Sequence, residues 1–143
     1  MKHGNNPETA AAFVNYEEMQ GSNLYSFGDI IKSYTTIIAT HFGGVILLNN
    51  RDYSHTTQRH KLHITRAARN LDIFEVPNIY RWNGLNKDDH RTNFEYLREE
   101  AQEAYKKSKR AKTDRTRIFW TEETKRRTET ARRYRDIFEV TAE

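Results

Sequence analysis

Two runs rich in isoleucine, threonine and valine, joined by Gly43-Gly44, constrain the fold of this 143-residue chain more than any other feature. The runs cover 30–42 and 45–49, and two glycines between them indicate a tight β-hairpin turn because glycine readily adopts positive φ. Such a turn fixes the register, since a slip by one residue would exchange the faces of both strands. Aliphatic residues occupy both faces near the turn, so we expect that end to be covered on two sides. The predicted pairs on one face are Phe42 with Val45, Thr40 with Leu47, Ile38 with Asn49 and Tyr34 with Tyr53.

The segments around this hairpin predict an α+β domain over residues 1–80. Asn6 is expected to cap a first helix, which Gly21 ends. Ser54 is expected to cap a second helix that runs to about Leu71 and lies on the sheet. The domain is thus a small antiparallel sheet with a packed helix. Its strands are expected over 24–27, 30–42, 45–49 and 72–76.

Residues 81–143 predict a basic helical hairpin, packed on the same core or projecting from it as an arm. Asp88 or Asp89 is expected to cap its first helix, and Thr121 its second. The second helix carries apolar residues at Ala131, Tyr134 and Phe138. The first has a coiled-coil-like seam that shrinks from large to small residues, formed by Phe94, Leu97, Ala101, Ala104, Ser108 and Ala111.

Positive charge is concentrated in the second half of the chain. Residues 1–80 contain seven Lys or Arg and seven Asp or Glu, whereas 81–143 contain seventeen against thirteen and carry the whole net charge of +4. The run 105–117 holds seven cations and one carboxylate, and six more cations follow over 125–135. Clustered cations attract polyanions because neutralised phosphates release counterions. This pattern favours a nucleic acid or a ribonucleoprotein as partner, with a solvated helix face as the alternative.

The candidate binding residues form two groups. In the helix expected after Ser54, Arg59, His63 and Arg66 recur at intervals of four and three and share one outward stripe. The candidates in the basic half are Lys106, Lys107, Lys109, Arg110, Lys112, Arg115, Arg117, Arg126, Arg127 and Arg133.

The sequence shows no pattern that supports an enzyme, so we expect a non-enzymatic protein without metal or cofactor. It has no cysteine, which excludes disulfides, thiol nucleophiles and cysteine-based metal sites. His60 and His63 are three apart on the expected helix, but no carboxylate lies between Asp52 and Asp72 to complete a metal site there. We expect His60 to pack at the core boundary instead.

A metal-dependent nuclease is kept as an alternative. Asp114 followed by Glu123 and Lys125 has a spacing like that of an acid with a Glu-x-Lys pair, which binds a metal and orients water. That arrangement normally rests on adjoining strands. Here Glu123 and Lys125 open a helix and are expected to point to different faces.

Composition also bears on the compartment. The longest apolar run, Ala10–Val14, is too short to cross a bilayer, and residues 1–7 lack the features of a secretion signal. Together with the absence of cysteine, this favours a reducing cytoplasm and no membrane partner.

The pentapeptide DIFEV occurs twice, at 72–76 and at 136–140. Little else in the two halves aligns, so we reject a repeat architecture. Two helices that run into similar apolar tails explain the match.

Three stretches resemble a small domain of uncharacterised phage and prophage proteins: SYTTIIA at 33–39, YSHTTQRH at 53–60 and FEVPN at 74–78. The resemblance covers residues 30–80. It implies a phage setting, and hence the cytoplasm of a host cell. It also implies a role for Tyr53–His60, where N–H groups at the expected helix start could hold an anion or a partner's backbone.

These observations lead to three hypotheses. The first is a phage accessory protein that binds nucleic acid or a host ribonucleoprotein and inhibits a host defence complex such as a CRISPR effector. The second is a structural protein that forms homo-oligomers through the seam of Phe94–Ala111. The third is the nuclease.

Overall fold

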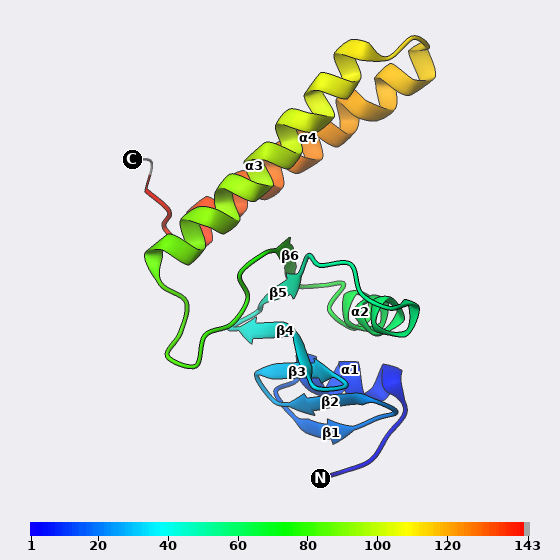
Figure 1. The fold of residues 1–143 in the computed structure, drawn as a ribbon, viewed down its shortest axis with the longest axis vertical. Helices are drawn as coiled ribbons and strands as arrows, with labels where there is room; N and C mark the ends of the chain where they lie inside the picture. The colour runs from blue at the N-terminus through cyan, green and yellow to red at the C-terminus, as the bar shows by residue number, and fades with distance from the viewer. Residues whose placement is uncertain (142–143) are drawn as a thin grey trace. The chain divides into compact units, whose positions relative to one another are not determined.

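The computed structural model describes residues 1–141, and the chain divides into two compact units with the boundary between Gly84 and Leu85 (Figure 1). The fold is α+β, as predicted, with a six-stranded, mostly antiparallel sheet in the first unit and a helical hairpin in the second. The sheet unit contains α1 (Asn6–Val14), β1 (Glu18–Gln20), β2 (Leu24–Phe27), β3 (Ile30–Ser33), β4 (Thr36–Phe42), β5 (Val45–Asn49), α2 (His55–Ala67) and β6 (Asp72–Val76). The hairpin unit contains α3 (Lys87–Arg110) and α4 (Asp114–Ile137).

The strands of the sheet follow one another in chain order from β1 to β6. Every neighbouring pair is antiparallel except β5 and β6, which run parallel because α2 carries the chain back between them. The predicted β4–β5 register is confirmed, with Phe42 opposite Val45 and Thr40 opposite Leu47. Gly43-Gly44 form the turn with φ of 51° and 92°, a conformation that favours glycine at both positions.

The prediction of one long strand over 30–42 is wrong. The chain turns at Tyr34-Thr35, and two strands, β3 and β4, pair on either side. Tyr34 adopts the left-handed backbone conformation at φ 57°, which residues other than glycine rarely adopt. The turn therefore has no glycine or other typical turn residue by which the sequence could predict it. The predicted pairing of Tyr34 with Tyr53 is therefore wrong, since neither residue belongs to a strand.

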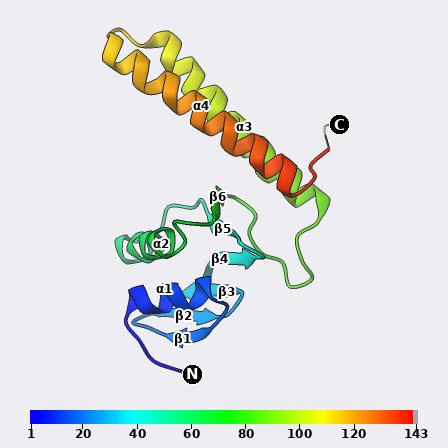
Figure 2. The same ribbon diagram turned by 180° about the vertical axis from the view of Figure 1, so that it is seen from behind.

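A single apolar core joins α1 and α2 to the sheet. Phe13 of α1 and Ile64 of α2 are fully buried in one cluster with Ile31, Ile38 and Ile46 of the strands. Figure 2 shows α1 in front of β2 and β3. Consecutive residues of β4 and β5 are buried, which confirms that this end of the hairpin is covered on both faces.

Both helices of the sheet unit differ from prediction at their ends. The N-cap of α1 is Asn5, one residue before the predicted Asn6, because Asn5 and Glu8 form a reciprocal capping box. This helix ends at Val14, and the chain then forms β1, a strand of three residues that is too short to show a period. Ser54 caps α2 as predicted, but the helix ends at Ala67 rather than near Leu71.

The helices of the hairpin unit begin earlier than predicted. Asn86 caps α3, and Asp89 is the third residue of its capping box rather than the cap. Thr113 caps α4, eight residues before the predicted Thr121. Residues 114–118 lack an apolar stripe, but the Thr113 cap and the Asp114–Arg117 ion pair support the first turn of α4.

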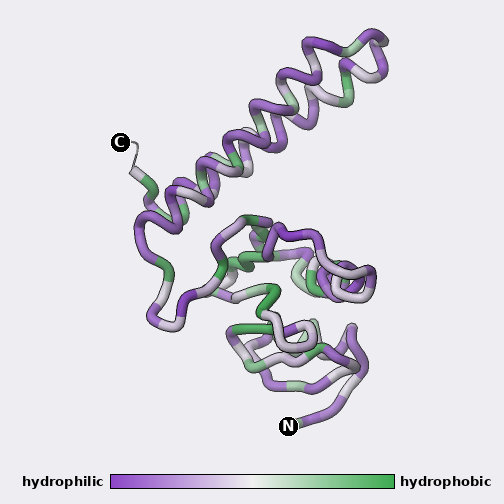
Figure 3. Tube along the Cα trace, in the orientation of Figure 1, coloured by the Kyte–Doolittle hydropathy of each residue, from purple (hydrophilic) through white to green (hydrophobic). Residues whose placement is uncertain are grey.

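The core of the hairpin unit is narrow. Leu97, Ala101 and Ala104 of α3 are buried, as are Ala131 and Tyr134 of α4, which confirms most of the seam. Small side chains let two helices approach closely and bury little apolar surface. Figure 3 accordingly shows a hairpin that is hydrophilic over most of its length, whereas hydrophobic residues gather in the strands of the sheet.

Candidate nucleic-acid interface

The densest positive charge lies where α3 meets α4, at residues 105–117, here called the basic tip. The last turns of α3, the turn at 111–113 and the first turns of α4 contribute to it, because the antiparallel hairpin folds both charged segments back to one end. All seven cations are exposed, and Asp114 is the only carboxylate in the segment. They are Lys106, Lys107, Lys109, Arg110, Lys112, Arg115 and Arg117.

Most of the tip's cations lack a carboxylate partner. Lys106 lies 3.4 Å from Glu103, and Arg117 lies 2.7 Å from Asp114. The other five have no such partner in the part of the chain that the structure describes, so their charge faces solvent. These five are Lys107, Lys109, Arg110, Lys112 and Arg115.

Aromatic rings lie beside these cations. Lys107 Nζ lies 4.5 Å from the centre of the Trp120 ring, and the Arg127 guanidinium lies 5.7 Å from it. Phe119 packs edge-on against Trp120 and is still 56% exposed, and Ile118 beside it is 63% exposed. Sequence reasoning missed these three apolar residues, although the string IFW directly after the cation run marks them.

The second cation cluster is paired within the hairpin. Arg126 and Arg127 both donate hydrogen bonds to Glu123, at 2.8 Å and 3.0 Å. The bond from Arg126 is the main reason that the pKa of Glu123 falls to about 2. Arg127 also reaches Glu100 of α3 at 3.2 Å, so it ties the two helices together, while Arg133 is exposed. Because most of its cations are paired with carboxylates, this cluster attracts a polyanion less strongly than the basic tip does.

The predicted stripe on α2 exists, on the sheet unit. Arg59 and Arg66 are exposed, and His63 between them is half-buried. Burial lowers the pKa of His63, and the charges of Arg66 and Arg59 lower it further. Because the stripe and the basic tip belong to different units, we treat them as separate surfaces.

The segment Tyr53–His60 turns its polar groups inward. Thr57 Oγ1 lies 2.9 Å from Ser33 Oγ, and His60 Nδ1 lies 2.7 Å from the same oxygen. His60 is 1% exposed, so the prediction that it packs at the core boundary is confirmed. These contacts link α2 to β3, and the Ser54 hydroxyl accepts a hydrogen bond from the N–H of Thr57. The side chains of Thr57 and His60 are thus occupied in holding the fold.

The nuclease residues do not converge. Asp114 and Glu123 both lie on α4, nine residues or roughly 13 Å apart along its axis. Lys125 lies 3.5 Å from Glu122, and Asp114 pairs with Arg117. Across residues 1–141, no three His, Asp or Glu side chains form a group that could hold a metal ion.

The predicted oligomerisation seam is used within the chain. Leu97, Ala101, Ala104 and Ser108 are buried on α3, whose partner in the hairpin is α4. Ala111 lies beyond the seam, at the C-cap of α3. A second copy would have to displace α4 to reach Leu97, Ala104 and Ser108.

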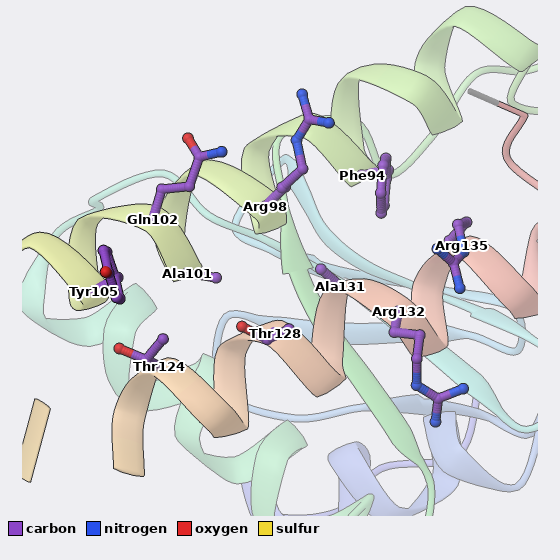
Figure 4. Close-up of a pocket in the computed structure, with 10 residues that line it drawn as sticks. All are labelled: Phe94, Arg98, Ala101, Gln102, Tyr105, Thr124, Thr128, Ala131, Arg132 and Arg135. Carbon is purple, nitrogen blue, oxygen red and sulfur yellow. The ribbon is translucent and has the colours of Figure 1, made fainter. Parts of the chain in front are cut away.

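A groove with a volume of about 490 Å³ runs along one face of the hairpin, between α3 and α4 (Figure 4). Ala101 and Ala131 lie at its middle, Tyr105 and Thr124 at one end, and Phe94 at the other. Sequence reasoning missed this site because its residues mix apolar, polar and charged types. The lining residues are Phe94, Arg98, Ala101, Gln102, Tyr105, Thr124, Thr128, Ala131, Arg132 and Arg135.

The helices over residues 1–141 include none that is both long enough and apolar enough to cross a membrane.

Comparison with known proteins gives one match. Residues 2–70 match a family of unknown function, DUF8033. The match begins earlier and ends earlier than the resemblance over 30–80, and it leaves β6 and the hairpin unit outside. No curated protein and no solved structure matches the chain.

Proposed function

We propose that this chain is a non-enzymatic binding protein whose basic tip holds nucleic acid, either free or within a ribonucleoprotein. One observation carries the proposal: five exposed cations without a carboxylate partner lie within nine residues at one end of the hairpin. Binding there releases counterions from the phosphates that the cations neutralise.

The distribution of charge along the hairpin supports this role. Outside the basic tip, residues 85–104 and 118–141 of the hairpin unit contain eleven Asp or Glu and nine Lys or Arg, whereas the tip contains one and seven. A polyanion is therefore attracted to the tip rather than to the rest of the hairpin, where carboxylates slightly outnumber cations. The Phe119 ring, exposed beside the cations, offers a surface on which a nucleobase can stack.

The biological setting is part of the same proposal. A phage accessory protein in the cytoplasm of its host would use this surface against a host ribonucleoprotein, such as a CRISPR effector. The support for this setting is the resemblance of residues 33–39, 53–60 and 74–78 to a domain of phage proteins.

Charge reversal at the basic tip tests the proposal. The test variant is Lys107→Glu, Lys109→Glu and Arg110→Glu combined. The control is Lys2→Glu, Arg51→Glu and Arg69→Glu combined, which changes the net charge equally at exposed positions of the sheet unit. The measurement is the fluorescence anisotropy of labelled single-stranded and duplex oligonucleotides, with circular dichroism to verify folding.

We expect the tip variant to bind about tenfold more weakly or worse, and the control to stay close to the unaltered chain. Equal losses in both variants would show that affinity follows net charge alone, and the proposal would fail. It would also fail if the unaltered chain bound neither oligonucleotide.

A further inference from the structure

Helix α3 carries more core-like surface than one neighbouring helix covers. On α3, Leu97, Ala104 and Ser108 are buried, as expected for a helix with one neighbour. A second stripe, with Phe94, Ala101 and Tyr105 at spacings of seven and four, lines the groove. A stripe this wide is typical of a helix with two helical neighbours rather than one.

The groove has the dimensions for a third helix. Phe94 and Tyr105 are eleven residues apart on α3, which corresponds to roughly 16 Å or three helical turns. Ala101 and Ala131 lie at the middle of the groove, and their small side chains leave room there for a large apolar side chain of a bound helix (Figure 4). A helix laid between α3 and α4 would complete a three-helix bundle.

The rim of the groove is positive. Arg98 lies over the Phe94 ring at 5.8 Å and Lys109 over the Tyr105 ring at 5.1 Å, and neither has a carboxylate partner among residues 1–141. On α4, Arg132 and Arg135 add two more cations.

Carboxylates offset only part of this charge. Arg132 pairs with Glu129 and, at 2.9 Å, with Asp136, which Arg135 also contacts at 3.3 Å. A ligand in this groove therefore meets an apolar floor between a positive edge on α3 and an edge of ion pairs on α4.

We infer that the groove binds an amphipathic helix of a partner protein, with an apolar stripe flanked by Asp or Glu. A second copy of this chain fits less well, because the groove lining contains three arginines and no carboxylate that could pair with Arg98 of the other copy. The inference is independent of nucleic-acid binding, since none of the five unpartnered cations lines the groove and only Lys109 contacts a lining residue, the Tyr105 ring.

Two synthetic peptides of about 14 residues, long enough for almost four helical turns, test the inference on the full chain. Both have leucines at helical spacing, and they differ only in flanks of glutamate or of lysine. Binding is measured by fluorescence anisotropy, and folding of the peptide by the gain in helical circular dichroism. Thr128→Glu places a charge in the groove, and Thr130→Glu, outside its lining, is the matched control.

We expect the glutamate peptide to bind at least about tenfold more tightly than the lysine peptide, and to become helical. Thr128→Glu should abolish this binding while Thr130→Glu retains it. Arg98→Glu should weaken the glutamate peptide by about fivefold and strengthen the lysine peptide, a reversal that a purely structural role would not produce.

Three results would overturn the inference. The first is no saturable binding of either peptide, and the second is equal binding of both. The third is a concentration-dependent dimer in sedimentation that Thr128→Glu dissociates, which would assign the groove to a second copy. A double variant, Lys107→Glu with Arg110→Glu, changes the basic tip but keeps Lys109. Peptide binding that survives in this double variant would show that the groove acts independently of the basic tip.

Discussion

The surroundings of four histidine side chains, in both units, lower their pKa and so favour the neutral ring. His41 is 5% exposed, stacks on Tyr16 at 4.0 Å and accepts a hydrogen bond from the N–H of Gly44 at Nε2. Burial is the main cause that lowers its pKa, as it is for His60, His63 and His90. All four therefore oppose protonation in the folded state.

This predicts that the chain loses stability as the pH falls from 7 to 5.5. Because each folded pKa lies below the ordinary value of 6.5, the unfolded chain takes up protons first, and the histidine contribution is complete above 6.5 and lost on acidification. Urea unfolding at several pH values measures the effect. His41→Gln should reduce the slope, whereas a free energy of unfolding that rises on acidification in this window would contradict the explanation.

Tyr134 joins the start of α3 to the end of α4, at the end of the hairpin opposite the basic tip. Tyr134 is fully buried, and its hydroxyl accepts a hydrogen bond from Asn93 Nδ2 at 2.8 Å and lies 2.7 Å from His90 Nδ1. Phe138 stacks on His90 at 4.4 Å and continues this cluster. The hairpin thus depends on a polar contact where its apolar seam is thin.

We expect Tyr134→Phe to destabilise the hairpin by about 1–3 kcal/mol, because it removes a hydrogen-bond partner from a buried amide. Thermal unfolding followed by helical circular dichroism measures this change. Tyr105→Phe, at an exposed ring, is the control and should stay within about 0.5 kcal/mol of the unaltered chain. Equal effects of the two variants would contradict the claim that the hydrogen bond of the Tyr134 hydroxyl stabilises the hairpin.

At the level of helices and strands, regular sequence patterns predicted which elements form better than they predicted where those elements begin and end. Gly43-Gly44 fixed the β4–β5 register because two positive φ values need a special residue type. The turn at Tyr34 and the three-residue strand β1 carry no such marker, and the sequence could not predict them. Asn86 capping α3 was missed because two aspartates beside it are equally good caps.

The two copies of DIFEV show how context decides local structure. The copy at 72–76 is strand β6, parallel to β5 and with Phe74 and Val76 buried. In the copy at 136–140, α4 ends at Ile137, and Glu139 adopts the left-handed conformation at φ 52°. The same five residues thus adopt two structures, which supports the rejection of an internal repeat.

The small seam of the hairpin gives a prediction about packing. Ala104 is fully buried on α3, and Ala104→Leu would force the helices apart at a cost of about 1–3 kcal/mol. Glu99→Leu, on an exposed position of the same helix, should change stability by no more than about 0.5 kcal/mol. Thermal unfolding of the two variants tests this, and a tolerated Ala104→Leu would show that the seam is not close-packed.

At the scale of the whole molecule, the apolar core and the net charge lie in different units. The apolar core lies in the sheet unit, and the net charge of +4 arises in the hairpin, mainly at its basic tip. The sequence predicted the cation clusters because charge can be counted. It could not predict which cations are paired, since Arg126 and Arg127 find Glu123 and Glu100 only once the helices form. The groove depends on two helices at once and was missed for the same reason.

The salt dependence of nucleic-acid binding tests the central claim most directly. Each phosphate neutralised on duplex DNA contributes about −0.9 to the slope of log K against log salt. We expect Lys107→Gln, Lys109→Gln and Arg110→Gln combined to make the slope shallower by up to about 2.7. Lys2→Gln, Arg51→Gln and Arg69→Gln combined should leave it unchanged. A slope that is the same in both triple variants and in the unaltered chain would show that the basic tip does not contact phosphates.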